Sequence, residues 1–156
     1  MTTNPFMTRA IALSIENVHS GRGGPFAAVI VKDGKIIAEG ANSVTSTNDP
    51  TAHAEVTAIR NASRALGTFD LHGCEIYTSC EPCPMCLGAI YWARLGHIFF
   101  AGTPSDAANA GFDDRFIYEE IARPHSQRKI PMTGMMREES LEGFRAWADK
   151  QDKIEY

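Results

Sequence analysis

The sequence predicts an α/β fold, a three-layer α/β/α sandwich in which helices cover both faces of one mostly buried sheet. Two patterns lead to this prediction. Stretches with helical spacing of apolar residues alternate along the chain with short β-rich apolar runs. The chain has 156 residues, of which 44% are hydrophobic, so it is long enough to bury a core of its own. Because the sequence shows no internal repeat, linker or low-complexity stretch, we expect a single domain over residues 1–156.

The first part of the chain has the pattern of a helix followed by a β-hairpin. Asn4 and Pro5 form a helix N-cap followed by proline at the first helical position. The Asp33-Gly34 pair, between two β-rich runs, is the signal of a tight hairpin turn. The expected elements are a helix from Pro5 to about Val18 and strands over Phe26–Val31 and Ile36–Gly40.

The rest of the chain continues the alternation of helices and strands. Asp49 and Pro50 repeat the cap-and-proline signature, and Gly67 is the expected stop of the helix that begins there. The later elements are expected to be strand Glu75–Ser79, a helix from Met85 to about Arg94, strand His97–Ala101, a short helix Phe116–Ile121 and a late helix around Leu141–Ala148, with loops over 43–49, 102–111 and 123–133 and a tail over Gln151–Tyr156.

Composition and charge narrow the class of protein. With 15 basic and 19 acidic residues the formal net charge is −4, which argues against a protein that grips nucleic acid through its phosphates. No apolar run approaches the roughly 18–20 residues of a membrane span. The N-terminus lacks a basic start followed by an apolar core, so we expect no signal peptide and a cytoplasmic protein.

The cysteines indicate a metal site rather than disulfide bonds. All four lie between Cys74 and Cys86, and such clustering in a reducing compartment favours a metal. Cys83 and Cys86 are three residues apart and share a face at the start of an expected helix. Helix N-termini favour anions and lower the pKa of a thiol, so they supply the thiolates that a metal needs.

His53 and Glu55 complete the pattern of a catalytic zinc site. His53 adds an imidazole nitrogen to the two thiolates, a donor set that suits Zn²⁺. Three protein ligands leave the fourth tetrahedral position for water, and bound Zn²⁺ lowers the pKa of that water towards about 7. Glu55 is the expected proton carrier beside this water. Because two residues correspond to about 200° around a helix, Glu55 has to reach back towards the site.

A closed structural zinc site is the alternative. Cys80 together with Cys83, Cys86 and His53 would supply four ligands and leave no position for water. This alternative leaves Glu55 without a role. The remaining cysteine, Cys74, comes just before a strand and is expected in the core.

These motifs resemble the cytidine deaminase superfamily of zinc-dependent nucleobase deaminases. The resemblance covers essentially the whole chain and rests on His53-Ala54-Glu55 and Pro82-Cys83-Pro84-Met85-Cys86, supported by Thr78–Pro82 and Leu87–Ile90. Within that superfamily the chain is most similar to the guanine deaminases, through Gly24–Phe26, Asn48–His53, Ala110–Asp114 and Lys153–Tyr156.

The resemblance implies a fold, a reaction and a partner. It implies a five-stranded mixed sheet between helices, one Zn²⁺ per chain and a homodimer, with neither nucleic acid nor membrane as a partner. The implied reaction is hydrolysis of guanine to xanthine and ammonia, in which Glu55 carries protons from water to a ring nitrogen and to the leaving amine. The tail Gln151–Tyr156 is implied to reach the neighbouring subunit's site and close it, with Tyr156 near the base. The alternative is a frayed chain end.

The candidates for contact with the base carry groups that complement guanine. Asp114 can accept from N–H groups and move a proton, unless it or Asp113 only caps the next helix. Asn42 can bond ring atoms through both ends of its amide, unless it is a turn residue. Phe26 and Trp92 can sandwich the ring, although such aromatic residues are more often core. The candidate site residues are His53, Cys83 and Cys86 for the metal, Glu55 and Asp114 for catalysis, and Asn42, Phe26, Ala54, Trp92, Asp114 and Tyr156 for the substrate.

Three rival functions stay open from the sequence. A tRNA adenosine deaminase has a similar cysteine motif, but a tRNA reader should carry a basic face. Cytosine, guanosine and triazine deaminases are separated poorly from a guanine deaminase by these residues. A non-catalytic, zinc-stabilised binding module would keep the metal without needing Glu55.

Overall fold

The structure is a computed structural model that describes residues 3–156. Two compact units divide these residues, one ending at Arg115 and the other running from Phe116 to Tyr156. The first unit holds every strand found in the described chain, and the second holds helices and loops.

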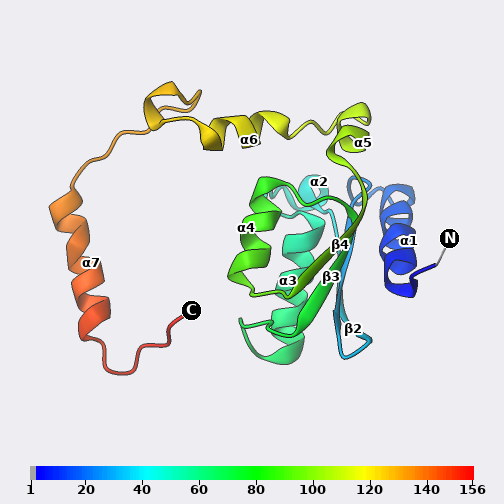
Figure 1. The fold of residues 1–156 in the computed structure, drawn as a ribbon, viewed down its shortest axis with the longest axis horizontal. Coiled ribbons are helices and arrows are strands. Elements are labelled where there is room, and N and C mark those ends of the chain that lie inside the picture. Colours follow the sequence, from blue (N-terminus) through cyan, green and yellow to red (C-terminus); the bar gives the residue numbers. More distant parts are fainter. Residues whose placement is uncertain (1–2) are drawn as a thin grey trace. The chain divides into compact units, whose positions relative to one another are not determined.

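Four strands form the mixed sheet of the first unit (Figure 1). Their order across the sheet is β2-β1-β3-β4, and β1 runs antiparallel to both β2 and β3, whereas β3 runs parallel to β4. Asp33 and Gly34 both have positive φ, 50° and 72°, in the turn between the first two strands, as the hairpin signal predicts. The strand bounds are β1 Ala27–Lys32, β2 Lys35–Ala41, β3 Cys74–Cys80 and β4 His97–Gly102.

Helix α1, Pro5–His19, covers one face of this sheet (Figure 1). The side-chain oxygen of Asn4 accepts hydrogen bonds from the main-chain N–H groups of the second and third residues that follow it, which confirms the predicted N-cap. The layer between helix and sheet consists of buried Ala10, Val29, Val31 and Tyr77, with Phe6, Met7 and Phe99 partly buried beside them.

Helices α3, Ala54–Leu66, and α4, Pro84–Trp92, cover the opposite face (Figure 1). Glycine brings α3 close to the sheet, because a Cβ atom on Gly40 of β2 would lie 2.3 Å from the carbonyl oxygen of Ala54. This contact fixes the N-terminal end of α3 against the sheet. The core on this side consists of Ala28, Ile30, Ala38, Ala54, Ala58, Ala62, Leu71, Cys74, Ile76, Ile90 and Ala93.

Two expectations about these elements are wrong. The sheet has four strands within residues 3–156 rather than five, because the chain after β4 forms helices and carries Pro124 and Pro131, which disfavour strand pairing. The four β-rich runs of the sequence account for the four strands. The helix expected from Asp49 begins instead at Ala54, because the Asp49 carboxylate accepts from the main-chain N–H of Thr51 and makes a turn there.

Short helices occupy two segments expected as loops. These are α2, Val44–Thr47, and α5, Pro104–Asn109. Helix α5 begins with a capping box, in which Thr103 and Asp106 bond each other's main-chain N–H groups. The capping-box residues Thr103 and Asp106 are visible in the sequence, but the many small residues of the segment favour the expectation of a loop.

The second unit contains most of α6, Arg115–Ala122, followed by a 3-10 turn η1, His125–Gln127, and α7, Arg137–Asp149. Both helices fall where the sequence predicts them. None of the unit's described residues is buried, and its exposed large apolar residues include Phe116, Ile121, Ile130, Met135, Phe144, Trp147, Ile154 and Tyr156. Over residues 3–156, no helix combines the length and apolar character that crossing a membrane requires.

Candidate metal centre and active site

The N-terminal ends of α3 and α4 bring the candidate metal ligands together. His53 is the N-cap residue of α3, and Cys83 is the N-cap residue of α4. Cys86 follows in the first turn of α4, where Pro84 takes the first helical position and removes an N–H that would have no helical partner. One donor atom from each of these residues lies within 4.8 Å of the other two. We call His53, Cys83 and Cys86 the donor triad.

The spacing of the donor triad fits a tetrahedral zinc ion. The Sγ atoms of Cys83 and Cys86 each lie 3.5 Å from Nδ1 of His53. A sulfur and a nitrogen bound to one tetrahedral zinc at ordinary bond lengths are also about 3.5 Å apart. Cys86 is buried, whereas His53 and Cys83 are partly exposed, so the group is accessible on one side.

Hydrogen bonding makes the two thiols of the donor triad unlike one another. The hydrogen bond from the side chain of Cys86, helped by His53 and by the Cys86 main chain, lowers the pKa of Cys83 to about 4. The same contact, followed by burial, raises the pKa of Cys86, and the bond to Cys83 raises the pKa of His53. A metal binds cysteine as the thiolate and histidine as the neutral imidazole, so binding a metal here would release the protons that these groups hold.

Glu55 lies directly against the donor triad. The residue is 7% exposed, and its Oε2 atom accepts a hydrogen bond from Sγ of Cys86 at 3.3 Å. Its Oε1 atom accepts one from Oγ1 of Thr78, also at 3.3 Å. Burial removes water from the carboxylate and raises the pKa of Glu55. The side chain thus does reach back to the site, and a raised pKa suits a group that both takes and gives protons.

The other two cysteines lie elsewhere. Sγ of Cys80 donates to the main-chain oxygen of Thr103 at 3.6 Å, and Cys80 does not belong to the group of possible ligands found among the described residues. Cys74 is fully buried in the core beneath α3 and α4. This geometry does not support the closed four-ligand site.

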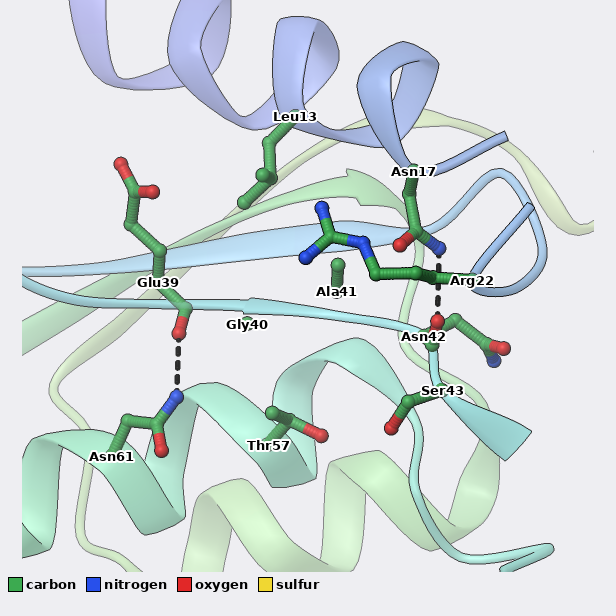
Figure 2. Close-up of a pocket in the computed structure, with 10 residues that line it drawn as sticks. All are labelled: Leu13, Asn17, Arg22, Glu39, Gly40, Ala41, Asn42, Ser43, Thr57 and Asn61. Atoms are coloured by element: carbon green, nitrogen blue, oxygen red, sulfur yellow. Dashed lines mark hydrogen bonds between the residues drawn. The ribbon is translucent and has the colours of Figure 1, made fainter. Parts of the chain in front are cut away.

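Asn42 follows β2 at the edge of a cavity of about 310 Å³ (Figure 2). Its Oδ1 atom accepts from the main-chain N–H groups of Gly24 and Val44, at 3.3 and 3.4 Å. Its main-chain oxygen accepts from Nδ2 of Asn17 at 2.8 Å (Figure 2). The backbone thus occupies the side-chain oxygen, and the NH₂ end of the amide is the end that remains for a base. The cavity is lined by Leu13, Asn17, Arg22, Glu39, Gly40, Ala41, Asn42, Ser43, Thr57 and Asn61, and so by none of the donor triad.

Asp113 and Asp114 have different surroundings. Oδ1 of Asp113 accepts from the main-chain N–H of Arg115 at 3.0 Å, so Asp113 makes the turn into α6. Partial burial raises the pKa of Asp114, and the negative charge of Cys83 raises it further. The negative charge of Cys83 thus acts on the carboxyl group of Asp114.

The other residues predicted to contact the substrate lie on several different elements. Phe26 packs edge-on against Phe112, with ring centroids 4.9 Å apart. Ala54 is fully buried as the first residue of α3, and Trp92 is 70% exposed as the last residue of α4. Tyr156 belongs to the second unit. Contacts of these residues with a base stay predictions.

Two residues, both within stretches that support the resemblance, are given no individual role by the sequence predictions. Thr78 hydrogen-bonds Glu55, and Phe112 contacts Phe26. A signal exists for Thr78, because a hydroxyl inside a buried strand needs a polar partner. Phe112 lies in the stretch 110–114 that supports the resemblance, but the residue pattern of this stretch does not indicate a contact with Phe26.

Comparison with known proteins assigns the fold and the site to a family. Residues 1–102, which contain the whole donor triad, match the family described as the cytidine and deoxycytidylate deaminase zinc-binding region. The chain is 58% identical to the guanine deaminase of Bacillus subtilis (strain 168) over 156 residues, which is 100% of both chains. The X-ray structure of guanine deaminase from Bacillus subtilis matches with a TM-score of 0.96 over 100% of this chain and 99% of that one.

More distant relatives match to different extents. The structure of guanine deaminase from Nitrosomonas europaea is 31% identical, with a TM-score of 0.68, over 94% of this chain and 85% of that one. A tRNA-specific adenosine deaminase of Aquifex aeolicus (strain VF5) is 48% identical over 77 residues, which is 49% of this chain and 51% of the relative. The zinc expected from the donor set is the metal of the matched family. The chain belongs to the cytidine and deoxycytidylate deaminase family.

Proposed function

We propose that this chain is a hydrolase that converts guanine and water to xanthine and ammonia. The observation that carries the proposal is the full-length likeness, at 58% identity, to a protein named guanine deaminase. The site supports it, because a buried glutamate lies against three donors that fit zinc. Each residue of that site has a chemical task in the reaction.

In this proposal His53, Cys83 and Cys86 hold one Zn²⁺ per chain. Zinc, when bound, is a Lewis acid that makes water reactive near neutral pH. The three donors come from helix ends that are already in place, so little rearrangement is needed to bind the metal. His53 and Cys83 are partly exposed, which is consistent with access of water to the metal.

Glu55 carries the protons. Its carboxylate accepts one proton from the attacking water and delivers it to the ring nitrogen next to C2 of guanine. It then takes the second proton of the same water and gives it to the exocyclic amine. Ammonia leaves, and C2 keeps the oxygen. Burial raises the pKa of Glu55, which favours uptake of a proton by its carboxylate.

The remaining candidates would orient the base. Guanine presents N–H donors together with acceptors at N7 and O6. Asp114 accepts from the donors, and the NH₂ group of Asn42 donates to an acceptor. Phe26 contacts one face of the ring and Ala54 its edge, whereas Trp92 ends α4 at the opposite end from Cys83 and is not assigned to this site. The partial burial of Asp114 and the free end of the Asn42 amide support these assignments.

We also infer that the chain works as a homodimer in the cytoplasm, each copy forming one deaminase domain whose tail closes the partner's site. Ile154 and Tyr156 support an exchanged tail, because both are exposed apolar residues within a charged segment. A closed site excludes water and strengthens its electrostatic interactions. The four unpaired cysteines suit a reducing compartment.

Ammonia release tests the proposed function. The purified, zinc-loaded chain is given guanine, guanosine, cytosine, adenine, a triazine and a tRNA with a wobble adenosine. We expect guanine to give the highest kcat/KM and tRNA to give none. Editing of the tRNA without ammonia from guanine would favour the activity that the Aquifex aeolicus relative is named for.

A further inference from the structure

We propose that Thr78 is a positioning residue, whose hydroxyl group holds the carboxylate of Glu55 in place for proton transfer. The inference rests on the proposed function, in which Glu55 carries the protons. It adds a residue that is neither a member of the donor triad nor one of the residues proposed to contact the base. Thr78 acts only through Glu55.

Thr78 offers its hydroxyl from a rigid place in the fold. It lies inside β3, where it pairs with Ala28 of β1 on one side and Phe100 of β4 on the other. The residue is 2% exposed. Its β-branched side chain has a strongly restricted χ1 angle, so the position of Oγ1 follows that of the strand. A hydroxyl donor fixed in this way limits the movement of the carboxylate to which it donates.

The hydroxyl contacts two oxygen atoms. Oγ1 lies 3.3 Å from Oε1 of Glu55 and 2.7 Å from the main-chain oxygen of Cys80. A hydroxyl has a single proton, so it donates to one of them at a time. Catalytic hydrogen bonds are often long in ligand-free structures and tighten when substrate binds. The hydroxyl thus connects Glu55 to the end of β3, which leads into the cysteine motif.

Metal binding increases the importance of this contact. The other side-chain donor to Glu55 is Sγ of Cys86, at 3.3 Å. A cysteine that ligates a metal does so as a thiolate, which has no proton to donate. Within residues 3–156, Thr78 is then the side-chain donor that remains to Glu55. Without it the carboxylate has three rotatable bonds and no side-chain anchor.

A matched pair of substitutions separates the hydroxyl from the packing. Thr78→Val keeps the shape and removes the hydroxyl, whereas Thr78→Ser keeps the hydroxyl and removes a methyl group. Thr57→Val is the control, because it removes a hydroxyl from α3 itself, two residues after Glu55. Thr57 lines the cavity beside β2 and not the donor triad (Figure 2).

Steady-state kinetics on guanine, with zinc content measured for each variant, form the first readout. We expect Thr78→Val to lower kcat about 10- to 100-fold, because it removes a hydrogen bond to a charged group, and to leave KM within about twofold. Thr78→Ser should recover most of the loss, and Thr57→Val should match the wild type. Wild-type kcat in Thr78→Val overturns the proposal. So do equal losses in both Thr78 variants, or a rise in KM alone.

Crystal structures of the zinc-loaded Thr78 variants form the second readout, which does not depend on activity. We expect the Glu55 carboxylate to be displaced or split between rotamers in Thr78→Val and to be in place in Thr78→Ser. An undisturbed carboxylate in Thr78→Val contradicts the inference. If the wild type releases no ammonia from guanine, the proposed function fails, and this crystallographic comparison still decides the role of Thr78.

Discussion

The two units of the chain differ in how they treat their apolar residues. The unit that ends at Arg115 buries apolar side chains on both faces of its sheet. The unit from Phe116 to Tyr156 has no buried residue, although its helices carry Phe116, Ile121, Phe144 and Trp147. Burial of apolar surface contributes about 25 cal/mol per Å², so only the first unit can stabilise itself. The first unit thus carries the buried core and the donor triad, whereas the second leaves its apolar side chains exposed.

The largest effect is expected for a change at Glu55, which should lower the turnover rate while the fold and the bound zinc are kept. Glu55→Gln keeps the shape of the side chain and removes its ability to carry protons. We expect kcat for guanine to fall by at least about 10²–10⁴, with one zinc still bound per chain. Ammonia release and metal analysis measure the two effects. Near-normal turnover would remove Glu55 from the mechanism.

Asp114 tests whether the chemistry extends to the end of the first unit. Asp114→Asn loses a charged acceptor, which corresponds to about 10- to 100-fold in kcat/KM for guanine. Asp113→Asn is the matched control, since its neighbouring carboxylate makes the turn into α6. Equal effects of the two substitutions on activity and on thermal stability would show that both residues serve the turn.

In the first unit, the sequence predicts the donor triad and Glu55 better than it predicts where the helices begin. The donor triad and Glu55 were recognisable because His53-Ala54-Glu55 and the cysteine motif are short, local patterns. The start of α3 was not, because Asp49-Pro50 has the same signature whether the aspartate caps a helix or makes a turn. The contact of Thr78 with Glu55 joins positions 23 residues apart, and only the folded chain brings them together.

The number of strands shows a limit of reasoning from resemblance. Local residue patterns indicate four strands, and the structure has four. The fifth was implied only by the family, and Pro124 and Pro131 follow in the segment that would have to supply it. The apolar residues of α6 and α7 are visible in the sequence. No local pattern identifies a surface that they would contact.

Deleting Gln151–Tyr156 tests the proposal that the tail closes the partner's site. We expect zinc to stay bound and kcat/KM for guanine to fall about tenfold or more, because an open site admits water. Mixing the truncated chain with inactive full-length Glu55→Gln should restore part of the activity, since a mixed dimer combines an intact tail with an intact Glu55. Full activity of the truncated chain alone would show a frayed end. Absence of rescue after confirmed subunit exchange would place the tail over its own subunit's site.

The smallest effect, a small loss of stability, is expected for the ion pair between Arg9 of α1 and Glu39 of β2. Arg9 donates to both carboxylate oxygens of Glu39, at 2.7 and 2.8 Å, and these bonds lower the pKa of Glu39. A lowered pKa stabilises the fold above the unfolded-state value of about 4.3 and ceases to do so as the pH falls through the folded-state value. Glu39→Gln should therefore cost no more than about 1 kcal/mol at pH 7, because the pair is partly exposed.

The thermal midpoints of this variant and of the wild type should converge as the pH falls below the unfolded-state value and through the lowered folded-state pKa of Glu39. Glu139→Gln, which changes an exposed carboxylate in the first turn of α7, is the control at each pH. A midpoint difference that stays constant with pH would mean that Glu39 stabilises the first unit by packing rather than by charge.

Zinc K-edge X-ray absorption on the zinc-loaded chain tests the central claim most directly. The account predicts two sulfur ligands at about 2.3 Å and one imidazole nitrogen at about 2.0–2.1 Å, with the same spectrum for Cys80→Ser. Three sulfur ligands in the wild type that fall to two in Cys80→Ser would contradict it, because they would describe a closed structural site with no position for water.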